Sequence, residues 1–510
     1  MSKANIIFIS KYIFTAKTDE LIDGYVAIAD NKILSIGKKE NYKQFVDNKT
    51  EVIDLGDKLI TPGFSDVHCF FMGYMLKEVG TDFSDCTTYK EVVEKANKEN
   101  AVFGHGLDLN RIKLPEKEEI DKNFNDRSII VFDKELETCL MNDLAIKKYK
   151  FTPDKCYPES YWRIFADIIK NKNFITEKFK KYMNMMNSRG ITSVKEMGFD
   201  DYYGFTEILK DLEQNNLLTL RVHFMSQPVG YRMNLDYALE SKEKFKSDWL
   251  KFSGFNQMTD GSISQFCGFL KEKYNSKDTY CEQDINWEEL EADTIKADTN
   301  NIRFSLHAQG DAAISKVLDI YEKCKKDNNG KLVNRHSITD LEFSDPVDLE
   351  RMGKMGVIAE IYPQIMSLYN REDKIKMTYD RIGENRAKYY WNRRKMQDSN
   401  VLISCATDLP LLIDNIPESI YHSCGGFFAD GKVPFNENNT INRLELMKAW
   451  TYGGQYNLYS ENKLGTLEEN KIADLVVMNE NIFETPLEKI RDSYVCLTMV
   501  NGNIVYNKKS

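Results

Sequence analysis

Three polar side chains follow short apolar runs of the sequence. His68 lies in LITPGFSDVHCFF, His307 in IRFSLHAQGD and Asp408 in VLISCATDLP. Imidazole and carboxylate groups bind divalent metals, and they also serve as general acids and bases. Asp408 has a structural interpretation as well, because Asp often caps the start of a helix. Each residue alone is ambiguous, so its meaning depends on where the fold places it.

The sequence contains only six histidines, so all of them can be weighed. Outside the two named above, each histidine is expected to be a packing or surface residue. These are His105, His223, His336 and His422.

Short strand-like runs alternate with longer helical patterns along the middle of the chain. After TPGFSDVH they are GITSV, LTLRVHFMS, LKFSGFNQM, IRFSLHA, HSITD, GVIAEIY and VLISCATD. Strand–helix alternation predicts parallel strands, and about eight of them predict a closed (β/α)₈ TIM-like barrel. Barrel enzymes gather their chemistry at the carboxyl ends of the strands. His68, His307 and Asp408 are expected at that end.

Both ends of the chain are predicted to be β structure. Residues 1–58 contain a hairpin signal at Asp30-Asn31-Lys32, and residues 461–510 contain another at Asn501-Gly502. Pairing the two ends would satisfy their open edges, which predicts a small β-sandwich domain built from both termini. The barrel would then occupy residues 59–460. Since a barrel needs only about 250 residues, an insertion is expected at about 72–188.

These segments together resemble the amidohydrolase superfamily, and within it a long branch that includes N-substituted formamide deformylases (amidohydrolase family 3). TPGFSDVH is similar to the first-strand motif and GITSV to the second. FNQMTDGSIS, SLHAQGDAAISKVLDIYE and CATDLPL resemble the later site strands, and LGTLEENKIADLVVMN resembles the carboxyl-terminal pattern. The resemblance runs nearly end to end and implies the barrel fold.

The same resemblance implies a metal-ligand set that this chain keeps only in part. The His-x-His pair is reduced to His68, because Phe70 takes the second position. Asn256 takes the place of the bridging lysine, while His307 and Asp408 are kept. The sixth-strand Glu-His appears as Thr339-Asp340, and an Asp-Gly-His of the insertion appears as Glu135-Leu136-Glu137.

The replacement of these ligand residues excludes an ordinary two-metal site. Side chains alternate along a strand, so Cys69 faces away from His68 and Phe70 and does not replace the missing histidine. The sequence predicts at most one divalent metal, zinc first, since catalytic zinc needs about three protein ligands and an open position. Its ligands would be His68, His307, Asp340 and Asp408. A metal-free site stays open as well, with Asp408 as base and His307 or His68 as acid.

Five side chains are predicted to line the substrate pocket. For two of them there is a structural alternative: Lys195 would form a loop ion pair with the adjacent Glu196, and Tyr362 would pack in the core. The predicted set is Phe70, Glu137, Lys195, Asn256 and Tyr362.

Three functions compete on these residues. The first is hydrolysis of a non-peptide C–N bond in a small neutral or cationic molecule. The second is a metal-independent reaction in the same barrel, such as lactone opening, isomerisation or proton transfer. The third is a non-catalytic binding module. The retained His307 and Asp408 favour an enzyme, and we expect the hydrolase.

Composition limits the partners. A formal charge of −10 argues against nucleic acid, which requires concentrated Lys and Arg. No run approaches the ~20 apolar residues of a membrane span. Ten scattered cysteines without a CxxC pair and without an export signal predict reduced thiols and a cytoplasmic protein. The family resemblance adds a homodimer as an expected assembly.

Overall fold

A computed structural model describes residues 2–76, 79–134, 138–153, 164, 172–198, 204–228, 232–412, 415–431 and 433–508. The chain forms two compact units. The first consists of Met1–Cys69, Lys180–Asp200 and Leu209–Ser510. The second consists of Phe70–Phe179 and Asp201–Ile208.

Eight parallel strands of the first unit form the barrel. Their order is β6 (Phe64–Cys69), β11 (Ile191–Glu196), β12 (Arg221–Ser226), β13 (Leu250–Met258), β14 (Phe304–Ala308), β15 (Ser337–Asp340), β16 (Ile358–Ile361) and β17 (Leu402–Cys405). The first and last strands meet where the Asp408 N–H donates to the His68 carbonyl at 2.9 Å. Asp66 adds a buried link by accepting from the Thr407 N–H at 3.1 Å. The predicted TIM-like barrel is confirmed.

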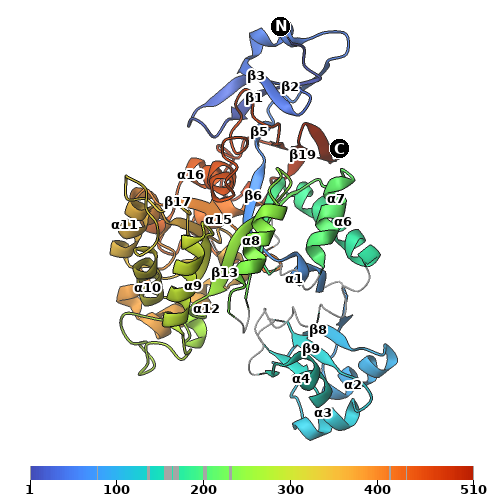
Figure 1. Cartoon of the computed structure of the whole chain (residues 1–510), viewed down its shortest axis with the longest axis vertical. Helices are drawn as coiled ribbons and strands as arrows, with labels where there is room; N and C mark the ends of the chain where they lie inside the picture. The colour runs from blue at the N-terminus through green and yellow to red at the C-terminus, as the bar shows by residue number, and fades with distance from the viewer. Residues whose placement is uncertain are drawn as a thin grey trace. The chain divides into compact units, whose positions relative to one another are not determined.

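Helices follow the strands and cover the outside of the barrel (Figure 1). Among them are α8 (Leu235–Lys244), α9 (Trp287–Thr299), α10 (Asp311–Tyr321), α11 (Pro346–Met355), α12 (Arg371–Ile382) and α14 (Arg393–Asp398). Helix α11 shows how the sequence sets such an element. Asp345 caps its first turn, Pro346 occupies the first helical position, and Gly356 ends it in the left-handed conformation at φ 71°.

The two ends of the chain pair into one eight-stranded sheet, as Figure 1 shows for the blue and dark red strands. Its strands are β1 (Ile6–Phe14), β2 (Leu21–Ala29), β3 (Lys32–Lys38), β4 (Glu51–Asp54), β5 (Leu59–Pro62), β18 (Leu475–Met478), β19 (Val495–Val500) and β20 (Asn503–Asn507). Asn501 and Gly502 form the predicted tight turn, with φ of 53° and 77°. The extra β domain built from both termini is therefore confirmed, whereas the exact domain boundaries stay predictions.

A buried ion pair fastens this sheet to the barrel. Arg221 of β12 donates to both carboxylate oxygens of Asp474, at 2.9 and 3.0 Å, and its guanidinium stacks over Trp249 at 4.5 Å. Asp474 also accepts the Asn501 N–H at 2.7 Å. The Ala-Asp-Leu-Val segment near the carboxyl terminus thus supplies a structural carboxylate.

Replacement of Asp474 by Asn is expected to lower the free energy of unfolding by about 2–3 kcal/mol, because a buried charged hydrogen bond is lost and Arg221 keeps an unpaired charge. Urea denaturation followed by circular dichroism measures this. Asp248→Asn is the control, since its pair with Lys463 is exposed. Equal stability of the two variants would contradict the fastening role of Asp474.

The second unit has its own four-stranded sheet. The order is β10 (Cys139–Met141), β9 (Ile130–Asp133), β8 (Phe103–Leu107) and β7 (Thr81–Asp82). Helices α2 (Tyr89–Lys98), α3 (Lys117–Asn123) and α4 (Asp143–Tyr149) accompany it, and Phe83, Phe124 and Leu140 belong to its apolar core. These elements come from the segment predicted as an insertion.

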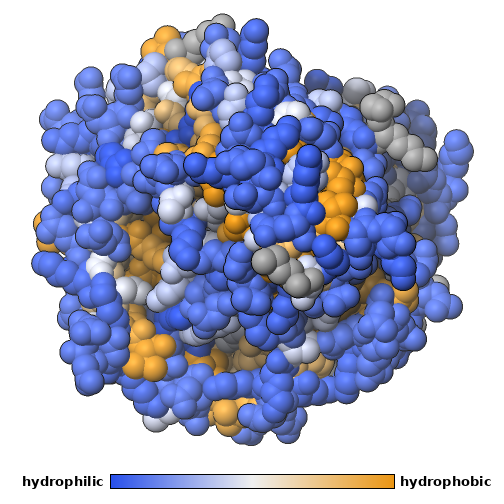
Figure 2. Space-filling model, turned by 90° about the horizontal axis from the view of Figure 1, so that it is seen from above, coloured by the Kyte–Doolittle hydropathy of each residue, from blue (hydrophilic) through white to orange (hydrophobic). Residues whose placement is uncertain are grey.

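The face of the molecule seen in Figure 2 is mainly polar. Figure 2 shows hydrophilic residues over most of one face, with separate small hydrophobic areas between them. Within the described residues, no helix combines the length and apolar character needed to cross a membrane.

Candidate active site

The carboxyl ends of the barrel strands bring the predicted chemical residues into two pairs. His68 lies near the end of β6, and its Nε2 is 3.7 Å from Oδ1 of Asp408, which follows β17. His307 of β14 has its Nε2 3.1 Å from Oδ2 of Asp340, the last residue of β15. Each pair joins one imidazole to one carboxylate, an arrangement suited to proton transfer.

Both carboxylates stand on strained backbone. Asp340 has φ 83°, its neighbour Leu341 has φ 59°, and Asp408 has φ 50°. Residues other than glycine rarely adopt such angles, and they persist where the surroundings hold them. Asp408 is held by its N–H bond to the His68 carbonyl, and Asp340 accepts from Gln309 Nε2 at 2.8 Å. The positions of the two carboxylates at the strand ends thus depend on these surrounding contacts.

His307 is held in its charged form. Burial lowers the pKa of His307, but the hydrogen bond and charge of Asp340, with the charges of Asp260 and Asp408, raise it to about 9. The Nδ1 of His307 lies 3.7 Å from Asp260 Oδ1. At neutral pH His307 is therefore an imidazolium, a group that donates protons and hydrogen bonds.

Asp260 organises the loops around this pair. Its carboxylate accepts the backbone N–H groups of Phe269, Gln309 and Gly310 at 2.8–2.9 Å. Burial raises the pKa of Asp260 to about 6, although His307 and these N–H groups lower it. Its signal in the sequence was the Asp-Gly-Ser motif, but sequence reasoning gave Asp260 no role in the site.

Asp408 is the more accessible carboxylate of the site. A quarter of its side chain (26%) is exposed, whereas the side chain of Asp340 is 11% exposed. Burial raises the pKa of Asp408, and the charge of His68 partly offsets that rise. A carboxylate that keeps contact with solvent while its pKa is raised is suited to take a proton from water.

Below the mouth, the barrel interior contains a buried charged network. Lys195 of β11 hydrogen-bonds Glu360 of β16 across the barrel axis. Glu360 also accepts from Arg303, Ser305, Thr339 and Asn457 at 2.9–3.2 Å. All six side chains are buried. Such charges are retained in an interior only when they are paired.

Glu360 connects this network to the candidate site, because its Oε2 lies 3.8 Å from Nδ1 of His68. Burial raises the pKa of Glu360, but the charges of Lys195 and Arg303 and the contact with His68 bring it well below its ordinary value. Burial lowers the pKa of Lys195 to about 7, with the charge of Glu360 acting against this. Since Glu360 is ionised, we take the pair as charged.

Comparison with known proteins identifies the family. The amidohydrolase family model matches residues 51–506. This chain belongs to the amidohydrolase family. The putative amidohydrolase YtcJ of Bacillus subtilis is 21% identical, over 95% of this chain and 96% of that protein. The N-substituted formamide deformylase of Arthrobacter pascens is 20% identical, over 42% of this chain and 38% of that protein.

A solved structure has the same fold. A metal-dependent hydrolase from Pyrococcus horikoshii, described as uncharacterized, matches with a TM-score of 0.75 and 19% identity, covering 95% of this chain and 99% of that one. At this identity the likeness establishes the barrel architecture. The superfamily assignment made from the motifs is confirmed, and the narrower link to formamide deformylases rests on a partial match.

The predicted metal ligands of this amidohydrolase do not form one centre. Metal ligands about 2 Å from a shared ion lie within a few ångströms of one another. Among the described residues, no three of His68, His307, Asp340 and Asp408 have ligand atoms within 4.8 Å of one another. The hydrogen bond with Asp340 also occupies His307 Nε2. In this arrangement the four side chains do not fit a three-ligand metal site, and their assignment as metal ligands stays a prediction.

Another triad of ligand-type residues lies elsewhere, at the amino-terminal end of the strands. Asp298, Cys324 and His336 are buried within 4.8 Å of one another. His336 Nδ1 accepts the Phe304 N–H at 2.9 Å and its Nε2 contacts Asp298 at 2.9 Å, so both ring nitrogens are in use. Burial raises the pKa of the Cys324 thiol to about 12. This triad acts as a hydrogen-bonded packing cluster, as expected for His336.

One predicted pocket residue, Lys195, is buried instead in the barrel interior. Lys195 and Glu196 are both buried inside strand β11, and they point to different partners: Lys195 to Glu360, and Glu196 to Tyr182. The loop ion pair considered from the sequence is wrong, because adjacent strand residues face opposite sides. Lys195 lies beneath the mouth and supports Glu360.

The other predicted pocket residues divide by location. Asn256 is buried in β13 beside Ser305, and its Oδ1 has no hydrogen-bond partner among the described residues. Tyr362 packs its ring edge-on to His68, with the ring centres 6.0 Å apart. Phe70 belongs to the second unit, and Glu137 lies outside the described residues. Their roles in substrate binding stay predictions.

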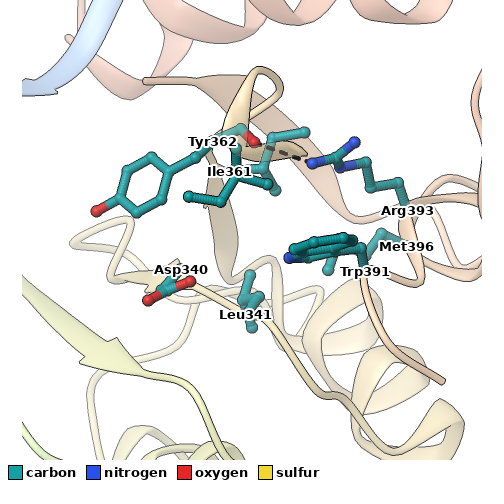
Figure 3. Close-up of a pocket in the computed structure, with 8 residues that line it drawn as sticks. Asp340, Leu341, Ile361, Tyr362, Trp391, Arg393 and Met396 are labelled. Atoms are coloured by element: carbon teal, nitrogen blue, oxygen red, sulfur yellow. Dashed lines mark hydrogen bonds between the residues drawn. The ribbon is translucent and has the colours of Figure 1, made fainter. Parts of the chain in front are cut away.

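Beside the site is a small pocket (Figure 3). Tyr362 and Asp340 line one side of it, and Trp391 and Arg393 line the other. Its volume is about 10 Å³, which is room for about one water-sized group. Sequence reasoning missed Arg393 and Trp391, because the motif YWNRRK gives no sign that the chain returns to the strand ends there.

Proposed function

We propose that this amidohydrolase hydrolyses a non-peptide C–N bond, such as an amide or formamide, in a small molecule. The family supports hydrolysis, and the partial match to an N-substituted formamide deformylase supports this bond type. The observation that carries the proposal is the opposition of an accessible carboxylate, Asp408, and a protonated imidazole, His307, at one barrel mouth.

The proposed reaction uses these two groups and no metal. Asp408 takes a proton from water as the water oxygen attacks the carbonyl carbon. His307, held charged through its Nε2 bond to Asp340, donates a hydrogen bond from Nδ1, which has no hydrogen-bond partner among the described residues, to the oxygen that becomes negative. As the C–N bond breaks, the leaving nitrogen takes the proton of His307, and the products are a carboxylic acid and an amine. Asp408 then releases the proton taken from water, and His307 takes up a proton from solvent, so both groups return to their starting states. His68 faces Asp408 and limits the rotation of its carboxylate.

A second candidate uses the same groups on a different bond. Lactone opening, isomerisation and proton abstraction each need one base and one acid, and none requires the metal centre that the ligand geometry fails to form. This geometry favours a metal-independent reaction over metal-activated water. A binding module without catalysis is the third candidate, which the strained acids at the strand ends argue against.

Partners and location are proposed from the sequence. We propose a small-molecule substrate, no nucleic-acid or membrane partner, a homodimer and a cytoplasmic location. The exposed apolar side chains of Met258, at the end of β13, and Leu411, in the segment after β17, support a partly apolar substrate.

The test is an assay of purified protein against N-substituted formamides, simple amides and lactones, before and after dialysis against a chelator. We expect turnover of an amide or formamide that stays within about twofold after dialysis, because no step needs a metal. Metal content by plasma mass spectrometry accompanies the assay. About one equivalent of bound metal, lost in His68→Ala and His307→Ala together with activity, would contradict the metal-free mechanism. Turnover of lactones alone would favour the second candidate.

The charge of His307 predicts a pH-dependent stability. Its pKa of about 9 in the folded protein is above the ordinary 6.5, so its protonated form stabilises the fold. This contribution is complete below about pH 6.5 and is lost as the pH rises through about 9. Its size is up to about 3 kcal/mol, at 1.36 kcal/mol per pKa unit. The difference in free energy of unfolding between wild type and His307→Gln should shrink from pH 6 to pH 10. A difference that stays constant over this pH range would contradict the charged state of His307.

A further inference from the structure

One buried cation of the barrel has no acidic partner among the residues that the structure describes. Arg393, the first residue of α14, is 5% exposed. Its Nη1 donates to Ser423 Oγ at 2.7 Å and its Nη2 to the Tyr362 carbonyl at 2.9 Å, the bond drawn in Figure 3. Both partners are neutral, and a guanidinium has five N–H donors. Arg393 therefore keeps its charge and most of its donor capacity.

Four other buried cations of the described residues each pair with a carboxylate. Arg221 pairs with Asp474, Lys195 and Arg303 pair with Glu360, and Lys374 pairs with Glu342. By contrast, Arg393 makes no ion pair with any carboxylate of the described residues, and the only charge effects on its pKa come from two thiols. Burial lowers the pKa of Arg393 to about 10, so it is still a cation at neutral pH.

The neighbouring residue, Arg394, is an arginine that does have acidic partners. Arg394 lies on the same helix with 31% of its side chain exposed, and it pairs with Asp398 and Glu445 at 2.8–2.9 Å. A buried charge without a partner is costly. The chain thus pairs the exposed arginine and leaves the buried one for a group that it does not itself supply.

The pocket beside Arg393 is placed to receive that group. Trp391, Leu341 and Met396 give it apolar walls that exclude water, and Asp340 lies at its far side (Figure 3). Its volume of about 10 Å³ admits one small group rather than a whole substrate. Asp340 also pairs with His307, so a ligand group at Arg393 would lie next to the candidate acid.

We propose that this pocket is a subsite for a monovalent anionic group bound by Arg393. Two sources share this chemistry: a carboxylate of the substrate, or a free inorganic anion. We favour the carboxylate, and this step rests on the proposed function, since the pocket adjoins the proposed acid. The substrate would then be an amide or formamide that carries a carboxylate, in place of the neutral or cationic molecule expected from the sequence.

The subsite is tested without any turnover. The thermal midpoint of the full chain is measured in sodium formate, acetate and chloride, each titrated against sodium gluconate at constant ionic strength. We expect a saturable rise of about 1–3 °C in wild type with formate or acetate. Arg393→Met should show no such rise. Arg394→Met should keep it, and it is the matched control because it removes an equal charge from the same helix.

Trp391 supplies a second measurement should Arg393→Met fail to fold. Formate should change the tryptophan fluorescence of wild type with the same midpoint as the thermal shift. Trp391→Phe should lose the fluorescence change and keep the thermal shift.

The results of these titrations distinguish a substrate carboxylate from a free inorganic anion, and both from the absence of an anion site. Stabilisation by formate and acetate supports a substrate carboxylate, and stabilisation by chloride alone supports a free inorganic anion. No saturable effect of any salt in wild type, or an equal effect in Arg393→Met, would overturn the subsite. Anion binding in a protein that hydrolyses no amide would leave the subsite standing while the proposed function fails.

Discussion

Replacing Asp408 by Asn is expected to lower kcat/KM by about 10²–10⁴-fold, the range contributed by a positioned general base. Asn has nearly the same shape, and it tolerates the left-handed backbone at φ 50° that this position requires. The N–H bond from residue 408 to the His68 carbonyl does not involve the side chain, so it is kept. The variant should therefore fold like wild type and lose the ability to take a proton from water.

The measurement is steady-state kinetics on whichever amide or formamide the panel identifies, with circular dichroism to verify folding. Asp398→Asn is the control, because Asp398 lies on the surface at the end of α14, where it pairs with Arg394. Activity of Asp408→Asn within threefold of wild type would show that another group is the base. If wild type and Asp408→Asn bind a ligand equally and neither turns it over, the non-catalytic binding module would be favoured.

The fold was predictable because its signals are local. Parallel strands alternate with helices, and each barrel strand appears in the sequence as a short apolar run that ends in polar residues. The placement of His68, His307 and Asp408 at one end follows from this topology alone. The turn at Asn501-Gly502 was also predictable, since only a few residue types adopt it. The pairing of the two termini followed from the β pattern at both ends of the chain.

The partners of those residues were not predictable in the same way. Which carboxylate meets which imidazole depends on side-chain directions at strand ends, where Asp340 and Asp408 leave regular strand geometry. The sequence therefore suggested one four-ligand centre, and the structure separates the four residues into two pairs. Arg393 was missed for a similar reason, since its position depends on how the segment between β16 and β17 returns to the barrel mouth.

The buried charged network of the barrel interior has a recognisable pattern in the sequence. GVIAEIY and NNIRFSL each contain one charged residue and GITSVKE contains two, although each run is otherwise uncharged and predicted as a strand. Charged residues are almost never fully buried unless they are paired. Three such residues on predicted strands of one closed barrel could have indicated that Lys195, Arg303 and Glu360 face one another. The sequence does not show which of these side chains meet across the barrel axis. Lys195 and Glu360 lie on the second and seventh barrel strands, which are not neighbours.

Replacing Glu360 by Gln is expected to lower the free energy of unfolding by about 3–5 kcal/mol, because it leaves the buried Lys195 and Arg303 facing each other without a counter-charge. The amide would also present its own N–H groups to donors that now share one carboxylate. Urea denaturation at pH 7, followed by circular dichroism, measures the loss. Glu461→Gln is the control. It weakens the pair with Arg335, which is partly solvent-exposed, and should cost about 1 kcal/mol or less.

A double-mutant cycle decides whether Lys195 is charged. If it is an ammonium ion, Lys195→Met should relieve part of the loss caused by Glu360→Gln, and the double variant will be more stable than the sum of the single losses by about 1–3 kcal/mol. If burial has neutralised Lys195, the losses will simply add. The cycle also bears on the site, because Glu360 is the group that faces His68 Nδ1. If the pair is charged, Glu360 is ionised beneath His68. That carboxylate then holds the His68 imidazole with its Nε2 toward Asp408, and this contact orients the proposed base.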